Sequence, residues 1–194
     1  MVLGNTWSFS ESVLGLDLAG SPKRRTGYAY LRKGKLFVGI IHTDEEILEL
    51  VKDFKLVAID APLSLPKGRE SLEKLGPHFR ECDLMLRQKG IRFFPATLGP
   101  MRVLTKRAMA LKESLTKLGI EVIETFPGGL YDLLGVKRRD KRAIVNLFKS
   151  FGLDLEERDY KQDELDAVAC LLSGLRYLNS QAVVFEGSDG TIFV

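Results

Sequence analysis

The sequence has few of the residues that bind zinc or form disulfides. Its 194 residues include two cysteines and two histidines, and neither cysteine belongs to a Cys-x-x-Cys pair or a Cys/His cluster. Zinc prefers nitrogen and sulfur ligands, so a zinc site of ordinary composition is not expected, and any metal site must be built from oxygen. Cys82 and Cys170 are expected to be reduced and to lie in different helices, with Cys82 as a small core residue.

Long apolar runs are also missing. No stretch approaches the ~20 apolar residues of a transmembrane helix, and residues 1–12 lack the basic and then apolar layout of a signal peptide. We therefore expect a cytoplasmic protein with no membrane partner. With 45% hydrophobic and 28% charged residues, the composition is that of a folded globular chain. The net charge of +3 is compatible with a nucleic-acid partner only if basic residues gather locally.

Apolar segments separated by glycine and proline predict an α/β domain. Segments with the length and branched residues of strands are 13–19, 26–31, 36–42, 55–60 and 120–125. One helix is expected after the N-cap Thr43, and further helices are expected at 80–89, 101–118, 130–134, 139–151 and 163–178. The economical architecture is a single domain over 1–194. It has a leader at 1–12, a mixed five-stranded sheet with helices on both faces, and a terminal β-hairpin at 182–194.

Acidic residues stand near the C-terminal ends of three predicted strands. Asp17 lies in GLDLAGS, Asp60 in AIDAP and Glu124 in VIETFP. One such acid is explained by a loop cap or by pairing with an arginine. Three in equivalent positions indicate a shared site, because ligands of open α/β sheets gather beyond the C-terminal ends of the strands.

The last predicted helix begins with further acids in the sequence Asp163-Glu164-Leu165-Asp166. Asp163 and Asp166 are three residues apart, so they lie on neighbouring positions of one helix face and can serve one site. Glu164 could substitute for either. The alternative is that Asp163 caps the helix and Asp166 completes a pair resembling a capping box. Small residues on the same side would let this helix approach the sheet closely; they are Ala167, Cys170 and Gly174.

Clustered carboxylates need a counter-charge. Two unit charges 4 Å apart repel by about 4 kcal/mol at an effective dielectric near 20, and a divalent cation removes that repulsion. Oxygen ligands favour Mg²⁺ or Mn²⁺ over zinc. Two such ions roughly 3.5–4 Å apart activate a water and stabilise the leaving oxygen of a phosphodiester. The sequence therefore predicts a metal-dependent nuclease whose metal ligands are Asp17, Asp60, Asp163 and Asp166, with Glu124 as a further catalytic carboxylate.

The order of these elements and acids resembles the ribonuclease H-like fold. GLDLAGSPKRRTGYAYL is similar to the first hairpin of the Holliday-junction resolvases of that superfamily, and DELDAVA is similar to their last acidic helix. More closely, the chain resembles an uncharacterised family of predicted ribonuclease H-like nucleases. The matching segments are 15–19, 59–62, 80–83, 124–127 and 163–167. The resemblance implies this fold, a carboxylate metal site and cleavage of nucleic acid.

Basic residues gather in two runs and on one predicted helix. Together they are expected to contact the phosphates of DNA or RNA; they are Lys23, Arg24, Arg25, Arg80, Arg87, Lys137, Arg138 and Arg139. Solvated helix faces are the ordinary fate of such charge runs. Phe93 and Phe94 could stack on bases, although core packing is more common for phenylalanine.

Two other functions remain open at this level. In a phosphotransferase or ATPase of the sugar-kinase or actin-like fold, Asp17, Gly20 and Ser21 would cradle a phosphate. A non-catalytic nucleic-acid-binding module would keep the fold without the chemistry, but a pure binder gains nothing from acids that face phosphate. The sequence leaves open the choice between DNA and RNA, the number of metal ions and the oligomeric state, with a homodimer among the options.

Overall fold

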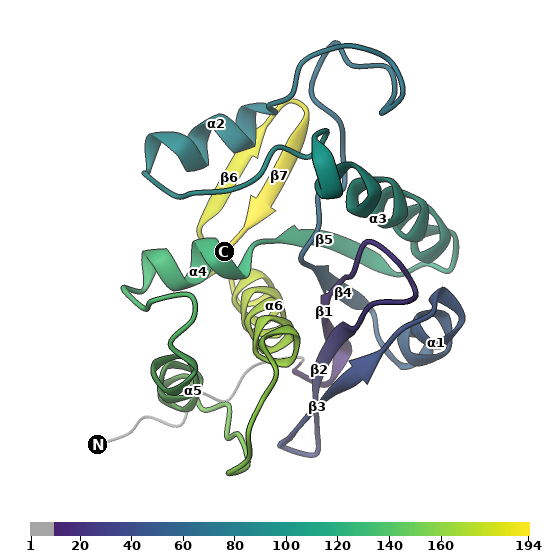
Figure 1. Ribbon diagram of the computed structural model, residues 1–194. Helices are drawn as coiled ribbons and strands as arrows, with labels where there is room; N and C mark the ends of the chain where they lie inside the picture. Colours follow the sequence, from purple (N-terminus) through teal and green to yellow (C-terminus); the bar gives the residue numbers. More distant parts are fainter. Residues whose placement is uncertain (1–9) are drawn as a thin grey trace.

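A computed structural model describes residues 10–194 and contains one seven-stranded mixed sheet (Figure 1). The strand order is β3-β2-β1-β4-β5-β7-β6. The first three strands form an antiparallel meander, whereas β1, β4, β5 and β7 run parallel to their neighbours in that order. The strands are β1 (Val13–Asp17), β2 (Thr26–Arg32), β3 (Lys35–Ile41), β4 (Leu56–Ile59), β5 (Glu121–Thr125), β6 (Val184–Gly187) and β7 (Gly190–Phe193).

The expected count of five strands is wrong, because the terminal hairpin belongs to the sheet. Strand β7 pairs with β5 in parallel, with Glu124 opposite Ile192 and Thr125 opposite Phe193. An edge strand such as β5 would otherwise present unpaired backbone groups, which a further strand can satisfy. Phe185 and Ile192 of the hairpin are buried in the same core cluster as the helices. The sequence predicts the hairpin itself, but not its pairing with β5.

The helices lie close to their expected positions. They are α1 (Asp44–Leu50), α2 (Glu81–Gln88), α3 (Gly99–Lys117), α4 (Pro127–Leu133), α5 (Lys141–Ser150) and α6 (Gln162–Leu178). Helix α1 begins after Thr43, whose side chain accepts the backbone N–H of Glu46, while the Glu46 carboxylate accepts the backbone N–H of Thr43. Residues 1–9 of the expected leader lie outside the described residues, and Ser10–Ser12 form a 3₁₀ turn.

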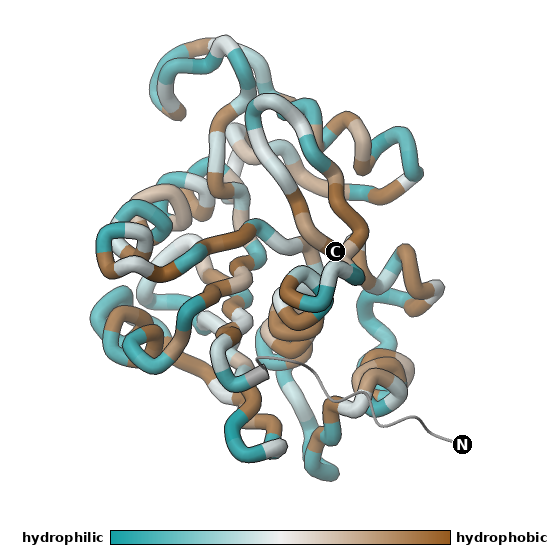
Figure 2. Tube along the Cα trace, turned by 180° about the vertical axis from the view of Figure 1, so that it is seen from behind, coloured by the Kyte–Doolittle hydropathy of each residue, from teal (hydrophilic) through white to brown (hydrophobic). Residues whose placement is uncertain are grey.

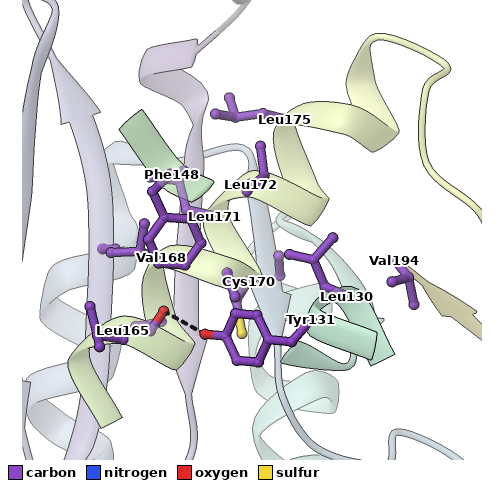
Figure 3. Packing of buried hydrophobic residues seen from close by; sticks show 14 of the residues in the cluster. Leu130, Tyr131, Phe148, Leu165, Val168, Cys170, Leu171, Leu172, Leu175 and Val194 are labelled. Atoms are coloured by element: carbon purple, nitrogen blue, oxygen red, sulfur yellow. Dashed lines mark hydrogen bonds between the residues drawn. The ribbon is translucent and has the colours of Figure 1, made fainter. Parts of the chain in front are cut away.

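Helices cover both faces of the sheet, as expected. Alternate residues of β1 and β4 enter two separate apolar clusters, with Val13 and Ala58 in one and Leu14 and Val57 in the other. The first cluster is completed by α2, α4, α5 and α6, and the second by α1 and α3. Figure 2 shows the apolar turns of α6 against the sheet, and Figure 3 shows its leucines packed with α4 and Phe148 of α5.

Helix α6 is seated directly on the backbone of β1 and β2. A Cβ atom on Gly15 would lie 2.3 Å from the carbonyl oxygen of Ala167, and one on Gly27 would lie 1.9 Å from that of Asp163. At the other end of the helix, a Cβ on Gly174 would lie 2.7 Å from Val13. The expected close approach is confirmed, and strand glycines contribute to it as well as the small residues of the helix. The first turn of α6 therefore lies at the C-terminal end of β1.

The search for a membrane-spanning element gives a negative result. Within residues 10–194, none of the helices combines the length and the apolar character needed to cross a bilayer.

Candidate active site

Asp17, Asp60 and Asp166 come from three different elements and meet at one end of the sheet. Asp17 ends β1 and Asp60 follows the adjacent parallel strand β4, where its N–H donates to the carbonyl of Leu16 at 2.9 Å. Gly15 and Ala58 face α6, and Asp17 and Asp60 stand two residues after them. Because side chains alternate along a strand, Asp17 and Asp60 lie on the same face of the sheet as α6. Asp166 lies in the first turns of α6. The fold therefore delivers three carboxylates into one region.

Burial and neighbouring acids oppose the ionisation of Asp17 and Asp60. Burial raises the pKa of Asp17 well above its ordinary value, and the charges of Asp60 and Asp166 raise it further. Burial, followed by the charge of Asp166, likewise raises the pKa of Asp60. The cationic groups that counteract these effects are Arg24 for Asp17 and Arg138 for Asp60, and each is the weakest influence on its acid. The cluster is thus a place where negative charge is poorly compensated.

Asp166 is held by two neutral donors. Tyr131 Oη and Gln162 Nε2 each donate to Asp166 Oδ1 at 2.9 Å, and the Tyr131 hydroxyl also lies 3.3 Å from the carbonyl of Leu165 (Figure 3). Burial raises the pKa of Asp166 to about 6, although these hydrogen bonds act in the opposite direction. Both donors bind the same oxygen. These two contacts orient the carboxylate through Oδ1 and leave Oδ2 to other partners.

Asp163 lies beside the cluster and has its own partner. Arg25 Nε donates to Asp163 Oδ2 at 2.9 Å, with about half of the Arg25 side chain exposed. The charge of Asp163 raises the pKa values of both Asp17 and Asp166, so it acts on the same site. An exposed ion pair of this kind is worth little, so the two side chains separate at low energetic cost.

The chemistry of the cluster fits a hard divalent cation. Asp17, Asp60 and Asp166 offer carboxylate oxygens, the ligands that such cations prefer, and burial together with neighbouring acids raises the pKa of each. In the part of the chain that the structure describes, no three acidic, histidine or cysteine side chains already have the spacing of a metal-binding group. Joint coordination therefore requires rotation of side chains, whereas the backbone already brings the acids to one end of the sheet.

Glu164 has a structural role, which corrects the expectation that it could replace an aspartate. Its carboxylate accepts the backbone N–H of Lys161 at 2.9 Å and pairs with Arg158 Nη2 at 2.8 Å. Glu164 therefore satisfies the N-terminal turn of α6. The alternative that Asp163 and Asp166 do this is wrong, so the two aspartates are available to the site.

Glu124 and Arg80 line the aromatic side of the site together with Asp60 and Asp166, and the charge of Glu124 contributes to the raised pKa of Asp60. Glu124 is opposite Ile59 in the sheet and alternates with Ile123, so its side chain leaves β5 on the face away from α6. Arg80 is 1% exposed and donates to both oxygens of Glu124 and to Asp83. The two side chains therefore neutralise each other in a buried ion pair, while the catalytic role of Glu124 and the phosphate contact of Arg80 stay predictions.

This buried network supports the segment that follows Asp60. Glu124 accepts the backbone N–H of Leu63 at 2.8 Å, and Arg80 Nη1 donates to Ser64 Oγ at 3.1 Å. Residues 61–64 are consequently tied to β5 and to the start of α2. The network therefore supports the position of the segment that directly follows Asp60.

Two pockets flank the carboxylates. The basic pocket, of about 480 Å³, is lined by Asp17, Asp163, Lys23, Arg24 and Arg25. The aromatic pocket, of about 360 Å³, contains Asp60, Asp166, Arg138 and Arg139 together with Phe93, Phe94 and Phe126. Met101 and Leu104 of α3 line both pockets. The two hollows are therefore neighbours, and the acidic cluster lies where they meet.

The remaining expected phosphate contacts are further from the acids. Arg87 lies over the ring of Phe79, 4.2 Å from its centroid, and lines a separate hollow. Lys137 lines another hollow, beside Asp132. Arg138 pairs with Asp132 at 2.6 Å while still reaching the aromatic pocket. Six of the eight expected cations line one of the two pockets. Lys23, Arg24 and Arg25 line the basic pocket, and Arg80, Arg138 and Arg139 line the aromatic pocket, although Arg80 is buried in its ion pair with Glu124.

Sequence reasoning missed Gln162 and Tyr131. Gln162 is four residues before Asp166, a spacing that places two side chains side by side on a helix, so this contact was available from the pattern. Tyr131 has no comparable signal, because it lies on α4 and reaches Asp166 only through the packing of α4 against α6.

Comparison with known proteins gives one family match. The model of a family described as "Protein of unknown function (DUF429)" matches residues 15–125, the segment from β1 to the end of β5 that includes Asp17 and Asp60. No curated protein matches the chain.

Proposed function

This chain belongs to the DUF429 family of proteins of unknown function, and from that starting point we propose that it is a metal-dependent nuclease that hydrolyses phosphodiester bonds in nucleic acid. The observation that carries the proposal is the cluster of Asp17, Asp60 and Asp166. Three carboxylates from separate elements have pKa values raised by burial and by neighbouring acids, and they line two adjacent pockets that also carry cations. Clusters of perturbed acids in a hollow are typical of functional sites.

The acids have the chemistry for Mg²⁺ or Mn²⁺. Asp17, Asp60 and Asp166 would hold the ion or ions, with Asp163 as a further ligand after its release from Arg25. When bound, such ions stabilise the developing charge on phosphate oxygens and lower the pKa of a water. The chain's own contribution is to position the ligands. Tyr131 and Gln162 both donate to Oδ1 of Asp166. These two hydrogen bonds fix the orientation of the carboxylate, and its other oxygen, Oδ2, is available to a metal ion.

The cations of the basic pocket have the charge to hold the substrate backbone. Lys23, Arg24 and Arg25 line the same hollow as Asp17, and Arg138 and Arg139 line the hollow on the other side of the acids. Contacts with phosphate fix the position of a strand without reading its sequence. Such contacts would bring a phosphodiester to the carboxylates from either side.

The topology supports a ribonuclease H-like fold for this nuclease. The order β3-β2-β1-β4-β5 combines an antiparallel meander with parallel strands, and a late helix carries two aspartates to the end of β1. The β6–β7 hairpin extends that five-stranded unit along its β5 edge. This proposed fold agrees with the resemblance of the sequence to nucleases of the superfamily.

A cleavage assay tests the proposal. Labelled single-stranded, duplex and branched DNA and RNA are incubated with the purified protein and Mn²⁺, Mg²⁺ or EDTA. We expect cleavage that depends on the metal and is lost in Asp17→Asn and Asp166→Asn. The control is Asp53→Asn, which removes an exposed carboxylate far from the cluster. A folded wild type that cuts no substrate with either metal contradicts the proposal, as does cutting that survives Asp17→Asn. Hydrolysis of ATP that requires Asp17 would favour the phosphotransferase class.

A further inference from the structure

Phe94 is an unusually exposed aromatic residue beside the acidic cluster. It lies in the connection between α2 and α3 and is 79% exposed. Its neighbour Phe93 is partly buried and makes an edge contact with Phe79, at 6.1 Å between ring centroids. Core packing thus explains Phe93 but not Phe94. A large phenyl ring left in water beside a pocket indicates a partner with an apolar surface.

The lining of the aromatic pocket is mostly apolar, and its polar members are the acids, the arginines, Thr125 and Gln162. Phe94, Met101 and Leu104 come from the α2–α3 connection and α3, and Phe126 comes from the end of β5. The volume of about 360 Å³ falls within the roughly 300–1,000 Å³ of typical small-molecule sites. A flat ring system fits this lining better than a strongly charged group, because most of the surface it would contact carries carbon.

The two pockets differ in chemistry on either side of the same acids. Lys23, Arg24 and Arg25 give the basic pocket the charge to hold phosphates, whereas the aromatic pocket offers ring faces. Within a nucleic acid strand, the groups nearest to a phosphodiester are its sugars and bases. A strand that presents one phosphodiester to Asp17 and Asp60 can therefore lay its backbone in one pocket and a base in the other.

We propose that the aromatic pocket binds one unpaired nucleobase of the strand that is cut, stacked on Phe94, so that the substrate class is single-stranded or locally unpaired nucleic acid. This inference rests on the nuclease function proposed above. A base within a duplex is covered by its neighbours and bonded to its partner, so it enters a pocket only after leaving the stack. Stacking on an aromatic side chain is tolerant of sequence, because every base has a flat face. Arg138 and Arg139 line the same pocket and supply positive charge for the adjoining phosphates.

Equilibrium binding of nucleic acid tests the proposal without requiring cleavage. Fluorescence anisotropy in EDTA compares a labelled 12-nucleotide single strand with the fully paired duplex of the same sequence. We expect the wild type to prefer the single strand, and Phe94→Ala to weaken single-strand binding by about 5- to 100-fold, the range of stacking on one aromatic residue. Duplex binding is expected to change little. Phe94→Trp is expected to retain the preference, because a larger ring still stacks.

The matched control is Leu98→Ala. Leu98 is an exposed apolar residue of the same connection, 45% exposed, and does not belong to the residues that line the aromatic pocket. It is expected to bind both ligands as the wild type does. Thermal melts of all three variants establish that they fold. Equal effects of Phe94→Ala and Leu98→Ala overturn the proposal, as does a wild type that prefers duplex. A free nucleoside monophosphate that competes at equal concentration overturns the assignment to a strand.

The failure of this inference can be told apart from failure of the nuclease proposal. The binding arms are read in EDTA, whereas the nuclease is read from metal-dependent cutting and its loss in Asp17→Asn. If cutting occurs but Phe94→Ala binds and cuts single strands normally, only the base pocket is rejected. If single-strand binding depends on Phe94 but no metal supports cutting, the pocket stands and the nuclease proposal fails.

Discussion

Arg80 donates to both carboxylate oxygens of Glu124 at 2.6 Å, and the two side chains are 2% and 7% exposed. Breaking a buried pair by removing one member leaves an uncompensated charge and costs about 3–5 kcal/mol. We therefore expect Arg80→Leu to lower the free energy of unfolding by that amount in urea titrations. Arg102→Leu is the control, because Arg102 is exposed on α3. Equal urea midpoints for the two variants would show that the pair does not stabilise the fold.

Substitution of Asp17 separates a metal ligand from a structural acid. Asp17→Asn removes a carboxylate whose ionisation is opposed by burial and by the charges of Asp60 and Asp166, so the metal-free variant is expected to be as stable as the wild type or more stable. Magnesium is expected to raise the melting temperature of the wild type, because an ion that binds only the folded state stabilises it. The variant should respond much less. A variant that melts clearly lower in EDTA and keeps the full magnesium response would contradict this role.

The raised pKa of Asp166 predicts a dependence of stability on pH. Its pKa is about 6 in the folded protein and about 3.9 in an unfolded chain. Between about pH 4 and pH 6 the folded state keeps a proton on Asp166 that the unfolded chain has lost. The contribution of this group to stability is therefore fully present below about pH 4 and is lost as the pH rises through about 6. The difference in unfolding free energy between wild type and Asp166→Asn reports this effect together with the influence of Asp166 on Asp17 and Asp60, and it should fall by about 3 kcal/mol between pH 4 and pH 7 in EDTA. A difference that stays constant from pH 4 to pH 7 would exclude the shift.

The contact between Gly15 and α6 predicts an unequal pair of glycine substitutions. In Gly15→Ala the new methyl group would lie 2.3 Å from the Ala167 carbonyl, whereas in Gly20→Ala the nearest atom is 3.4 Å away. Overpacking costs about 1–3 kcal/mol or more, so Gly15→Ala is expected to lower the unfolding free energy and to impair cutting by displacing α6. Gly20→Ala is expected to be near neutral in stability. Similar losses in chemical denaturation would show that α6 is not seated on Gly15.

The basic pocket predicts a change in salt dependence. A double substitution, Lys23→Ala with Arg24→Ala, removes two cations that line the pocket. Each lost phosphate contact should reduce the slope of log affinity against log salt by about 0.7–0.9. Lys35→Ala with Lys149→Ala removes the same charge from distant exposed positions and is expected to leave the slope closer to that of the wild type. Anisotropy titrations at several salt concentrations measure both, and equal slopes for the two double variants would remove Lys23 and Arg24 from the binding surface.

The alternation of strand residues explains which acids the sequence could place. Asp17 and Asp60 stand at the ends of neighbouring parallel strands, and the apolar segments that precede them were sufficient to predict those strand ends. In the sequence, Glu124 has the same position at a strand end as these two aspartates. In the sheet, however, Glu124 is opposite Ile59, so the residue that lines up with Asp60 is Thr125. A shift of one residue turns a side chain to the other face. Register between strands far apart in the sequence is not encoded in either segment alone.

The sequence also could not predict which acid of α6 would accept the backbone N–H group at the start of the helix. In Asp163-Glu164-Leu165-Asp166 all three acids stand in the first turns of α6, where any of them could satisfy the helix end. Glu164 takes that role because Arg158, from the preceding loop, joins it there. The general position of the helix followed from its apolar spacing. The assignment of each acid depended on tertiary partners that no local pattern contains.

The seat of α6 on Gly15 and Gly27 has a consequence for the motion of the site. Since peptide groups of the helix touch the peptide backbone of β1 and β2 without intervening side chains, the spacing between Asp17 and Asp166 depends on rigid main-chain contacts rather than on rotamers of the core. Thermal fluctuation should therefore move α6 and β1 as one body, and their amide hydrogens should exchange with solvent together, by a shared opening of both elements. Flexibility at this end of the sheet would then belong to the carboxylate side chains and the surrounding loops.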